Sequence, residues 1–264
     1  MNLPVNFEQT LSLVGVSSFR YYETIGSTNQ VALDWLQQGA PDQAIVFADH
    51  QSSGKGRLSR TWVTNPGSAV AVSVIFKPTP EEKKLSYLFS PLAGVALADL
   101  LRNIYNLAAE IKWPNDVLIN EAKTAGILSE ANWEGDRLNG IVLGIGINIT
   151  PQSLPPLENL QYPATCIQNH VEIPIDRFQF LAQFLQSLFN WRKNLTQPIF
   201  FNSWEKLLAF RDKNVYIKGN DGSTICSGFV HGILPNGDLQ IRTEGQEIKT
   251  FTVGDVHLRQ KQVK

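Results

Sequence analysis

Short runs of apolar residues, bounded by polar or turn-forming residues, recur through the first half of the chain. Residues 44–49 and 69–76 are two such runs, the second rich in valine and isoleucine, and both predict buried strands. Residues 138–149 predict a longer, nearly continuous apolar strand. Shorter strands broken by turns are predicted at residues 19–22, 111–113, 117–119 and 127–130.

Helical periodicity separates these predicted strands. Apolar residues recur at helical spacing over residues 87–105, 178–195 and 201–210. A further helix is predicted to begin at Ser27, because Ser27 and Gln30 match a capping box. Gly39 stands where a helix-ending glycine is expected. The order of elements predicts an α+β fold, with a central mixed sheet flanked by helices.

The pattern changes around residues 211–213, beyond which the chain has only short strands and turns. Turn signals at residues 220–222 and 235–238 lie between alternating runs, as in β-hairpins. We therefore expect residues 1–212 to form one α/β domain and residues 213–264 a small all-β barrel. A chain of 264 residues is long enough for one large and one small domain.

Composition narrows the classes of function. The 23 lysines and arginines nearly balance 24 acidic residues, which argues against a general affinity for nucleic acid or an anionic membrane. The two cysteines, Cys166 and Cys226, are far apart and match neither a disulfide framework nor a zinc motif. No signal peptide or membrane-spanning run is evident. A cytoplasmic protein is expected.

Candidate chemistry concentrates in residues 51–62, which hold several cations, two glycines and a tryptophan. Such a loop can close over an anionic, partly aromatic ligand, since glycine allows close approach and cations neutralise phosphate. A P-loop is excluded, because Asp49 stands where its first glycine belongs and Gly56 follows Lys55. A dinucleotide fingerprint fails at Ser59. The alternative is a solvated basic loop between two strands.

Three further segments are weak when taken singly. They are Lys-Trp-Pro-Asn-Asp at 112–116, Lys-Thr-Ala-Gly-Ile-Leu-Ser-Glu at 123–130 and Gly-Ile-Gly-Ile-Asn-Ile at 144–149. Each has an ordinary structural alternative: lysines are mostly solvated, aspartate often caps turns, and strand glycines often mark bulges.

Taken together and in order, these segments and Ser27-Thr28-Asn29 resemble the biotin–protein ligase family. The resemblance covers residues 27–149, and the C-terminal part is similar to that family's SH3-like domain. Lys55 stands where the family usually has arginine, and Ser59 where glycine is common. Family members that also repress transcription begin with a DNA-binding domain. Here the Ser-Thr-Asn segment ends at Asn29, so a ligase without such a domain is expected.

The resemblance implies a reaction in two steps. Biotin's carboxylate attacks the α-phosphorus of ATP to give biotinyl-5'-AMP, and an acceptor lysine then displaces AMP. By resemblance, Lys123, Arg57 and Lys112 are catalytic. Asp116 is implied as a Mg²⁺ ligand, since this cation favours oxygen donors. The implied biotin-binding residues are Ser27, Thr28, Asn29, Gln51, Gly54, Lys55, Arg57, Lys123, Gly126, Gly144 and Ile147. The implied ATP and adenylate residues are Arg57, Arg60, Thr61, Trp62, Asn115, Lys123 and Asn148.

The implied partner is the biotin carboxyl carrier protein of acetyl-CoA carboxylase. Binding to DNA or to a membrane is not expected. A homodimer is left open. One alternative is a lipoate or octanoate ligase or transferase on a related scaffold. Another is a non-catalytic binding module, such as a repressor or a biotin sensor. The near-neutral charge disfavours a repressor, and the presence of Lys112, Lys123 and Asp116 disfavours an inactive enzyme.

Overall fold

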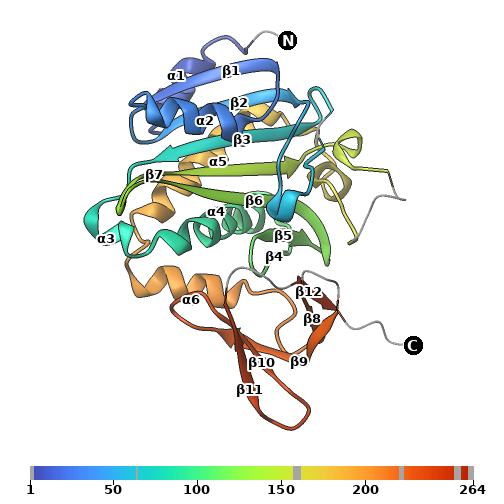
Figure 1. The fold of residues 1–264 in the computed structure, drawn as a ribbon. Helices are drawn as coiled ribbons and strands as arrows, with labels where there is room; N and C mark the ends of the chain where they lie inside the picture. Colours follow the sequence, from blue (N-terminus) through green and yellow to red (C-terminus); the bar gives the residue numbers. More distant parts are fainter. Residues whose placement is uncertain (1–2, 64, 157–161, 220–222, 253–256, 261–264) are drawn as a thin grey trace.

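A seven-stranded mixed sheet forms the larger part of the molecule, with the strand order β1-β2-β3-β7-β6-β5-β4 (Figure 1). The computed structural model describes residues 3–63, 65–156, 162–219, 223–252 and 257–260. The strands are β1 (Ser18–Ile25), β2 (Ala44–Gln51), β3 (Ala69–Phe76), β4 (Ala109–Lys112), β5 (Asp116–Ile119), β6 (Ala122–Glu134) and β7 (Arg137–Asn148). The β1–β2 pair is parallel and the other neighbours are antiparallel, which confirms a mixed sheet.

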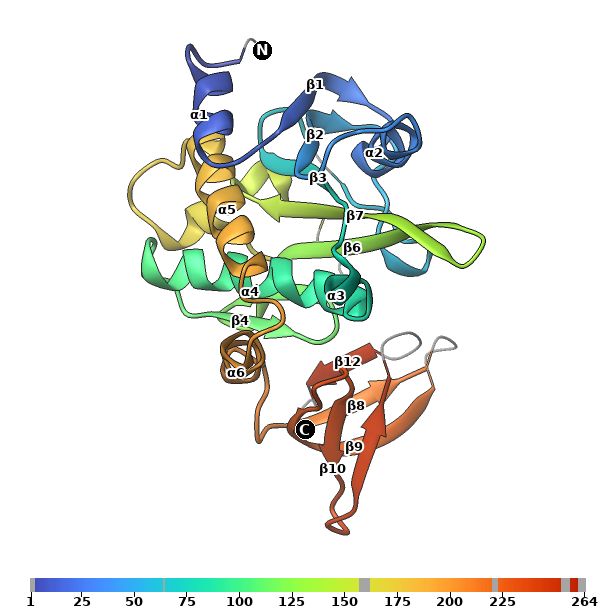
Figure 2. The same cartoon turned by 90° about the vertical axis from the view of Figure 1, so that its left-hand side faces the viewer.

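Helices cover both faces of this sheet, which explains why β2 and β3 are almost entirely buried and mainly apolar. Every residue of β3 is buried. In Figure 2, α1, α4 and α5 lie on one side of the sheet and α2 on the other. The helices are α1 (Phe7–Leu13), α2 (Thr28–Gln37), α3 (Pro80–Lys83), α4 (Phe89–Asn103), α5 (Arg177–Arg192) and α6 (Pro198–Lys206). No helix among the described residues is both long and apolar enough to cross a membrane.

The start of α2 differs from its prediction. Ser27 is the N-cap residue, but its side chain makes no capping hydrogen bond, so the predicted capping box is wrong. The amide N–H of Thr28 instead donates to Gln51 Oε1, 2.8 Å away, at the end of β2. A tertiary contact thus supports the first amide of the helix, which is not the amide that the capping box would have served. The predicted glycine at the end of this helix is confirmed, since Gly39 has a φ of 94°.

Helix α1 was absent from the sequence prediction, although the strand expected at residues 19–22 is present within β1. Only Phe7 and Leu11 of this helix are buried. Their spacing of four residues places both on one face, but two positions make a weak periodic signal.

The C-terminal part is a five-stranded sheet with the order β11-β10-β9-β8-β12. Its strands are β8 (Asn214–Lys218), β9 (Thr224–Ile233), β10 (Leu239–Arg242), β11 (Ile248–Phe251) and β12 (His257–Gln260), and every pair is antiparallel. An all-β C-terminal part is therefore confirmed, but within the described residues the outer strands β11 and β12 do not pair, so the expected barrel is not closed. The turn predicted at 235–238 is present, whereas the one at 220–222 lies outside the described residues.

A cluster of charges joins the C-terminal end of α5 to α3 and to the loop before β2. Arg192 donates to both carboxylate oxygens of Glu82, at 2.8 and 2.9 Å, and to Asp42 at 2.7 Å. Burial alone would raise the pKa of Glu82, but the hydrogen bonds from Arg192 outweigh it and hold this pKa below its ordinary value. The cluster therefore depends on the guanidinium.

We predict that Arg192→Leu lowers the free energy of unfolding by about 3 kcal/mol at pH 7, because it leaves Glu82 buried without its cation. Glu82 has a depressed pKa, so its contribution is present above 4.5 and is lost as the pH falls through the folded-state pKa. The difference between variant and wild type should therefore shrink below pH 4.5. Urea unfolding of both proteins at each pH measures this difference in the free energy of unfolding. The exposed Arg137→Leu is the control, and equal losses in the two variants would contradict the prediction.

Candidate functional site

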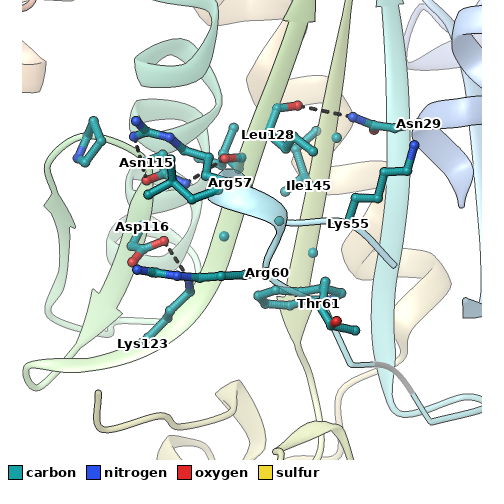
Figure 3. Close-up of a pocket in the computed structure, with 18 of the residues that line it drawn as sticks. Asn29, Lys55, Arg57, Arg60, Thr61, Asn115, Asp116, Lys123, Leu128 and Ile145 are labelled. Carbon is teal, nitrogen blue, oxygen red and sulfur yellow. Dashed lines mark hydrogen bonds and ion pairs between the residues drawn. The ribbon is translucent and has the colours of Figure 1, made fainter. Parts of the chain in front are cut away.

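One cavity brings together most of the predicted site residues. It is bounded by the start of α2, the end of β2, β6 and β7 (Figure 3). Two connecting segments complete it: residues 52–62, here called the glycine loop, and residues 113–115 with the flanking Lys112 and Asp116, here called the β4–β5 turn. The predicted residues that line it are Ser27, Thr28, Asn29, Gln51, Lys55, Arg57, Arg60, Thr61, Trp62, Lys112, Asn115, Asp116, Lys123, Gly126 and Gly144. These residues come from segments far apart in the sequence.

Uncharged polar side chains line one end of the cavity, and hydrogen bonds among them and to Ser73 and Glu130 hold them in place. Gln51 Oε1 accepts hydrogen bonds from the amide and the hydroxyl of Thr28, at 2.8 and 3.0 Å. The hydroxyl of Ser73 lies 2.8 Å from the Thr28 hydroxyl and 2.5 Å from Asn29 Oδ1. Asn29 Nδ2 donates to Glu130 at 2.6 Å. The side chains at this end are therefore fixed by one another before any ligand arrives.

Glycines in β6 and β7 form the floor of the cavity. A Cβ atom on Gly144 would lie 2.1 Å from Asn29 Oδ1, and one on Gly146 would lie 2.2 Å from the Trp62 ring. A Cβ on Gly126 would come within 3.0 Å of the same ring. The indole of Trp62 therefore rests on the sheet at positions where a side chain would displace it. Its Nε1 is buried and has no hydrogen-bond partner in the described part of the chain.

Cations gather around one carboxylate at the other end. Asp116 lies 2.6 Å from Lys123 Nζ and 3.4 Å from Lys112 Nζ. Its burial would raise its pKa, but the two ammonium groups outweigh this effect and hold the pKa of Asp116 below its ordinary value. Arg57 donates to Asn115 at 3.3 Å, so the glycine loop contacts the β4–β5 turn directly (Figure 3).

Three predicted site residues lie outside this lining. The carbonyl of Gly54 accepts a hydrogen bond from the Trp62 amide at 2.9 Å, and Gly54 lines a second cavity that shares part of the loop with the first. Ile147 is fully buried in the core. The Asn148 side chain donates to the Thr165 carbonyl at 3.1 Å.

Two residues that contact the polar network were not predicted. Ser73 is fully buried, and it is the one polar residue in the otherwise apolar β3. That contrast is the signal in the sequence, because a buried hydroxyl needs a partner. Glu130 ends the segment 123–130, for which the resemblance implies no role at this position. Its carboxylate anchors Asn29.

The residues that line the cavity do not complete a magnesium site by themselves, since Mg²⁺ is usually held by one or two carboxylates together with substrate phosphates. Asp116 is the one carboxylate in the lining, and two lysines already neutralise it. No group of three or more histidine, cysteine, aspartate or glutamate side chains in the described ranges is arranged to hold a metal. The geometry assigns Asp116 to the lysines.

Comparison with known proteins identifies the family. Residues 21–148 match the model of the biotin/lipoate A/B protein ligase family. The chain is 31% identical to the biotin–[acetyl-CoA-carboxylase] ligase of Paracoccus denitrificans over 222 residues, which are 82% of this chain and 90% of that protein. The chain belongs to this family.

Other relatives extend the comparison. The chain is 36% identical to the bifunctional ligase/repressor BirA of Bacillus subtilis over 157 residues, covering 60% of this chain and 48% of that protein. It thus spans about half the length of that relative. The fold is similar to that of the biotin protein ligase from Aquifex aeolicus in complex with biotin and ATP. The TM-score is 0.78, with 24% identity, and the match covers 93% of this chain and 100% of that chain.

We predict that the Asp116 carboxyl titrates below 3.8 in the folded protein, because two ammonium groups favour its charged form. A depressed pKa means that this carboxylate stabilises the fold above 3.8 and loses its contribution as the pH falls through the lower folded-state value. The carboxyl ¹³C resonance, assigned by its loss in Asp116→Asn, reports the titration. Asp136→Asn, in an exposed turn, is the assignment control. A midpoint at or above 3.8 would contradict the prediction.

Proposed function

We propose that this protein is an ATP-dependent ligase that activates biotin as biotinyl-5'-AMP and transfers it to a lysine of a biotin carboxyl carrier protein. The observation that carries the proposal is the division of one cavity into an uncharged polar end and a cationic end. The relatives support it, since the Paracoccus protein is a biotin–[acetyl-CoA-carboxylase] ligase and the Aquifex structure contains biotin and ATP.

Biotin's shape fits this division. Its ureido ring is neutral and carries donors and acceptors, and the network of Thr28, Asn29 and Gln51 offers both. Gly144 leaves room beside Asn29. The aliphatic tail would lead away from Gly144, which would bring the carboxylate toward Arg57 and Lys123. We do not extend the biotin site to Gly54 and Ile147, which face elsewhere.

The first step needs the cationic end. A carboxylate oxygen of biotin attacks the α-phosphorus of ATP, and the bond to the departing pyrophosphate breaks. Two unit charges about 4 Å apart repel by about 4 kcal/mol at an effective dielectric near 20. Lys112, Lys123, Arg57 and Arg60 line the cavity and supply opposing charge that is already in place. Arg60, Thr61 and Trp62 are proposed to face the nucleotide.

The second step needs no nucleophile from this chain. The amine of the acceptor lysine attacks the anhydride carbonyl, AMP departs with the bonding electron pair, and the amine loses a proton. The cavity's role is to hold the adenylate and to keep water from it. Closure of the glycine loop over the adenylate would serve that purpose.

Magnesium would enter with the nucleotide's phosphates and not through a site built by the protein. In this arrangement Asp116 positions Lys112 and Lys123, and no step is assigned to a metal bound by Asp116. The ion, when present, would neutralise phosphate charge.

The proposal also assigns the parts of the chain. Residues 1–212 form the catalytic domain, and residues 213–264 a smaller domain of SH3-like type. We place the reaction in the cytoplasm, in keeping with the two cysteines, which are both free.

Radiolabelled pyrophosphate exchange into ATP tests the proposal. Exchange should require biotin, and excess lipoate or octanoate should not replace it. Exchange supported by lipoate and not by biotin would favour the alternative activity within the same family. Absence of exchange with any of these acids would reject an adenylate-forming ligase.

We predict that Lys123→Ala lowers biotin-dependent exchange about 100-fold, a loss typical of removing one preorganised group from a developing charge. The fold should survive, since Lys112 still pairs with Asp116. Circular dichroism checks the fold, and Lys193→Ala, an exposed position, is the control. A wild-type exchange rate in Lys123→Ala would contradict the assigned role.

A further inference from the structure

One hydrogen bond joins the cationic end of the cavity to the C-terminal sheet. Trp113 is fully buried, and its indole Nε1 donates to the carbonyl of Gly237 at 2.9 Å. The two residues are 124 positions apart in the sequence. In Figure 2 the C-terminal sheet lies beneath the β4 edge of the larger sheet.

The acceptor belongs to a turn with a fixed shape. Leu234 and Asp238 close the turn through a backbone hydrogen bond of 2.8 Å, and the Gly237 amide donates to Leu234 at 2.8 Å. Asn236 bridges to the Asp238 side chain at 2.8 Å. Gly237 itself has a φ of 88°, a conformation that favours glycine. The turn therefore presents its carbonyl in one direction.

The donor belongs to the β4–β5 turn, which carries cavity residues on both sides of Trp113. Lys112 precedes it, and Asn115 and Asp116 follow it. On the side of β6, Asn115 is held by two hydrogen bonds with the Ile127 backbone, at 2.8 and 2.9 Å. Arg57 of the glycine loop also donates to Asn115. The bond to Gly237 is a further attachment of this turn, and it comes from the C-terminal sheet.

We propose that the C-terminal sheet positions the cationic end of the cavity through this bond, with Trp113 and Gly237 as positioning residues. A shift of the β4–β5 turn moves Lys112 and Asp116 together, and Lys123 follows because it pairs with Asp116. The uncharged end is built from α2, β2 and β3, which the turn does not carry. The inference rests on the proposed function, and it assigns the C-terminal sheet to nucleotide handling.

The chain offers a matched control for this bond. Trp204 is 1% exposed, and its Nε1 has no hydrogen-bond partner in the described residues. Trp113→Phe and Trp204→Phe therefore remove the same atoms from buried sites, but the first also removes a hydrogen bond and alters a residue that lines the cavity, so the acceptor variant described below is needed beside them. A purely structural effect should appear in both variants.

Steady-state pyrophosphate exchange separates the two ends of the cavity. Trp113→Phe should raise the KM for ATP at least fivefold, with the KM for biotin within twofold of wild type. Trp204→Phe should change neither KM. An ATP KM of Trp113→Phe within twofold of that of Trp204→Phe would overturn the inference, and so would equal rises in both KM values. If wild-type protein shows no biotin-dependent exchange, the proposed function fails instead.

A reciprocal variant tests the acceptor. Gly237→Ala strains a residue with positive φ and should turn its carbonyl away from Trp113. The KM for ATP of Gly237→Ala should therefore rise, as that of Trp113→Phe does. In the double variant Trp113→Phe/Gly237→Ala, the KM for ATP should rise by less than the product of the two single-variant factors, because both substitutions remove the same hydrogen bond. Independent, multiplicative effects would contradict the coupling. Thermal unfolding of each variant shows that the protein assayed is folded.

Discussion

The ion pairs of Asp116 are the interaction on which the site depends. Several cations line one small cavity, and like charges at such distances repel in a partly dry environment. One carboxylate, with 13% of its side chain exposed, holds two of the ammonium groups in place. An anionic ligand then meets cations that are already oriented, which is the condition for electrostatic stabilisation without reorganisation. In the described structure these pairs engage the one carboxylate of the lining.

The sheet makes this arrangement from short local pieces. The β4–β5 turn supplies Lys112 and Asp116, and β6 returns beside it with Lys123. Strands β6 and β7 then supply glycines where the Trp62 indole lies flat. The polar end is built on the opposite side by α2, β2 and β3. Each end is therefore fixed by different elements, and the glycine loop lies between them.

The sequence predicted the strands well where both faces are covered, since β2, β3 and β7 read as apolar runs. It missed α1, in which two buried residues give too little periodicity. It assigned Ser27 a local cap that the structure lacks, and it did not predict that Gln51 of a distant strand accepts from the Thr28 amide. Contacts of that kind depend on tertiary structure, which local pattern does not carry.

The site residues likewise fall into those that the sequence pattern predicts and those that only tertiary contacts reveal. Motifs located most of the lining, because their order along the chain is specific. They did not identify Ser73, which belongs to no motif. Alternation along β7 also distinguishes two glycines that face the cavity, Gly144 and Gly146, from Ile147, which faces the core. The motif alone does not separate these residues. The alternation of strand side chains between the two faces of the sheet does.

The most direct test of the account is a crystal structure of the protein with biotinyl-5'-AMP or a non-hydrolysable analogue. The account predicts the ureido ring beside Thr28 and Asn29, and the phosphate within reach of Arg57 and Lys123. A phosphate bound away from both cations, or a ligand seated outside this cavity, would contradict it.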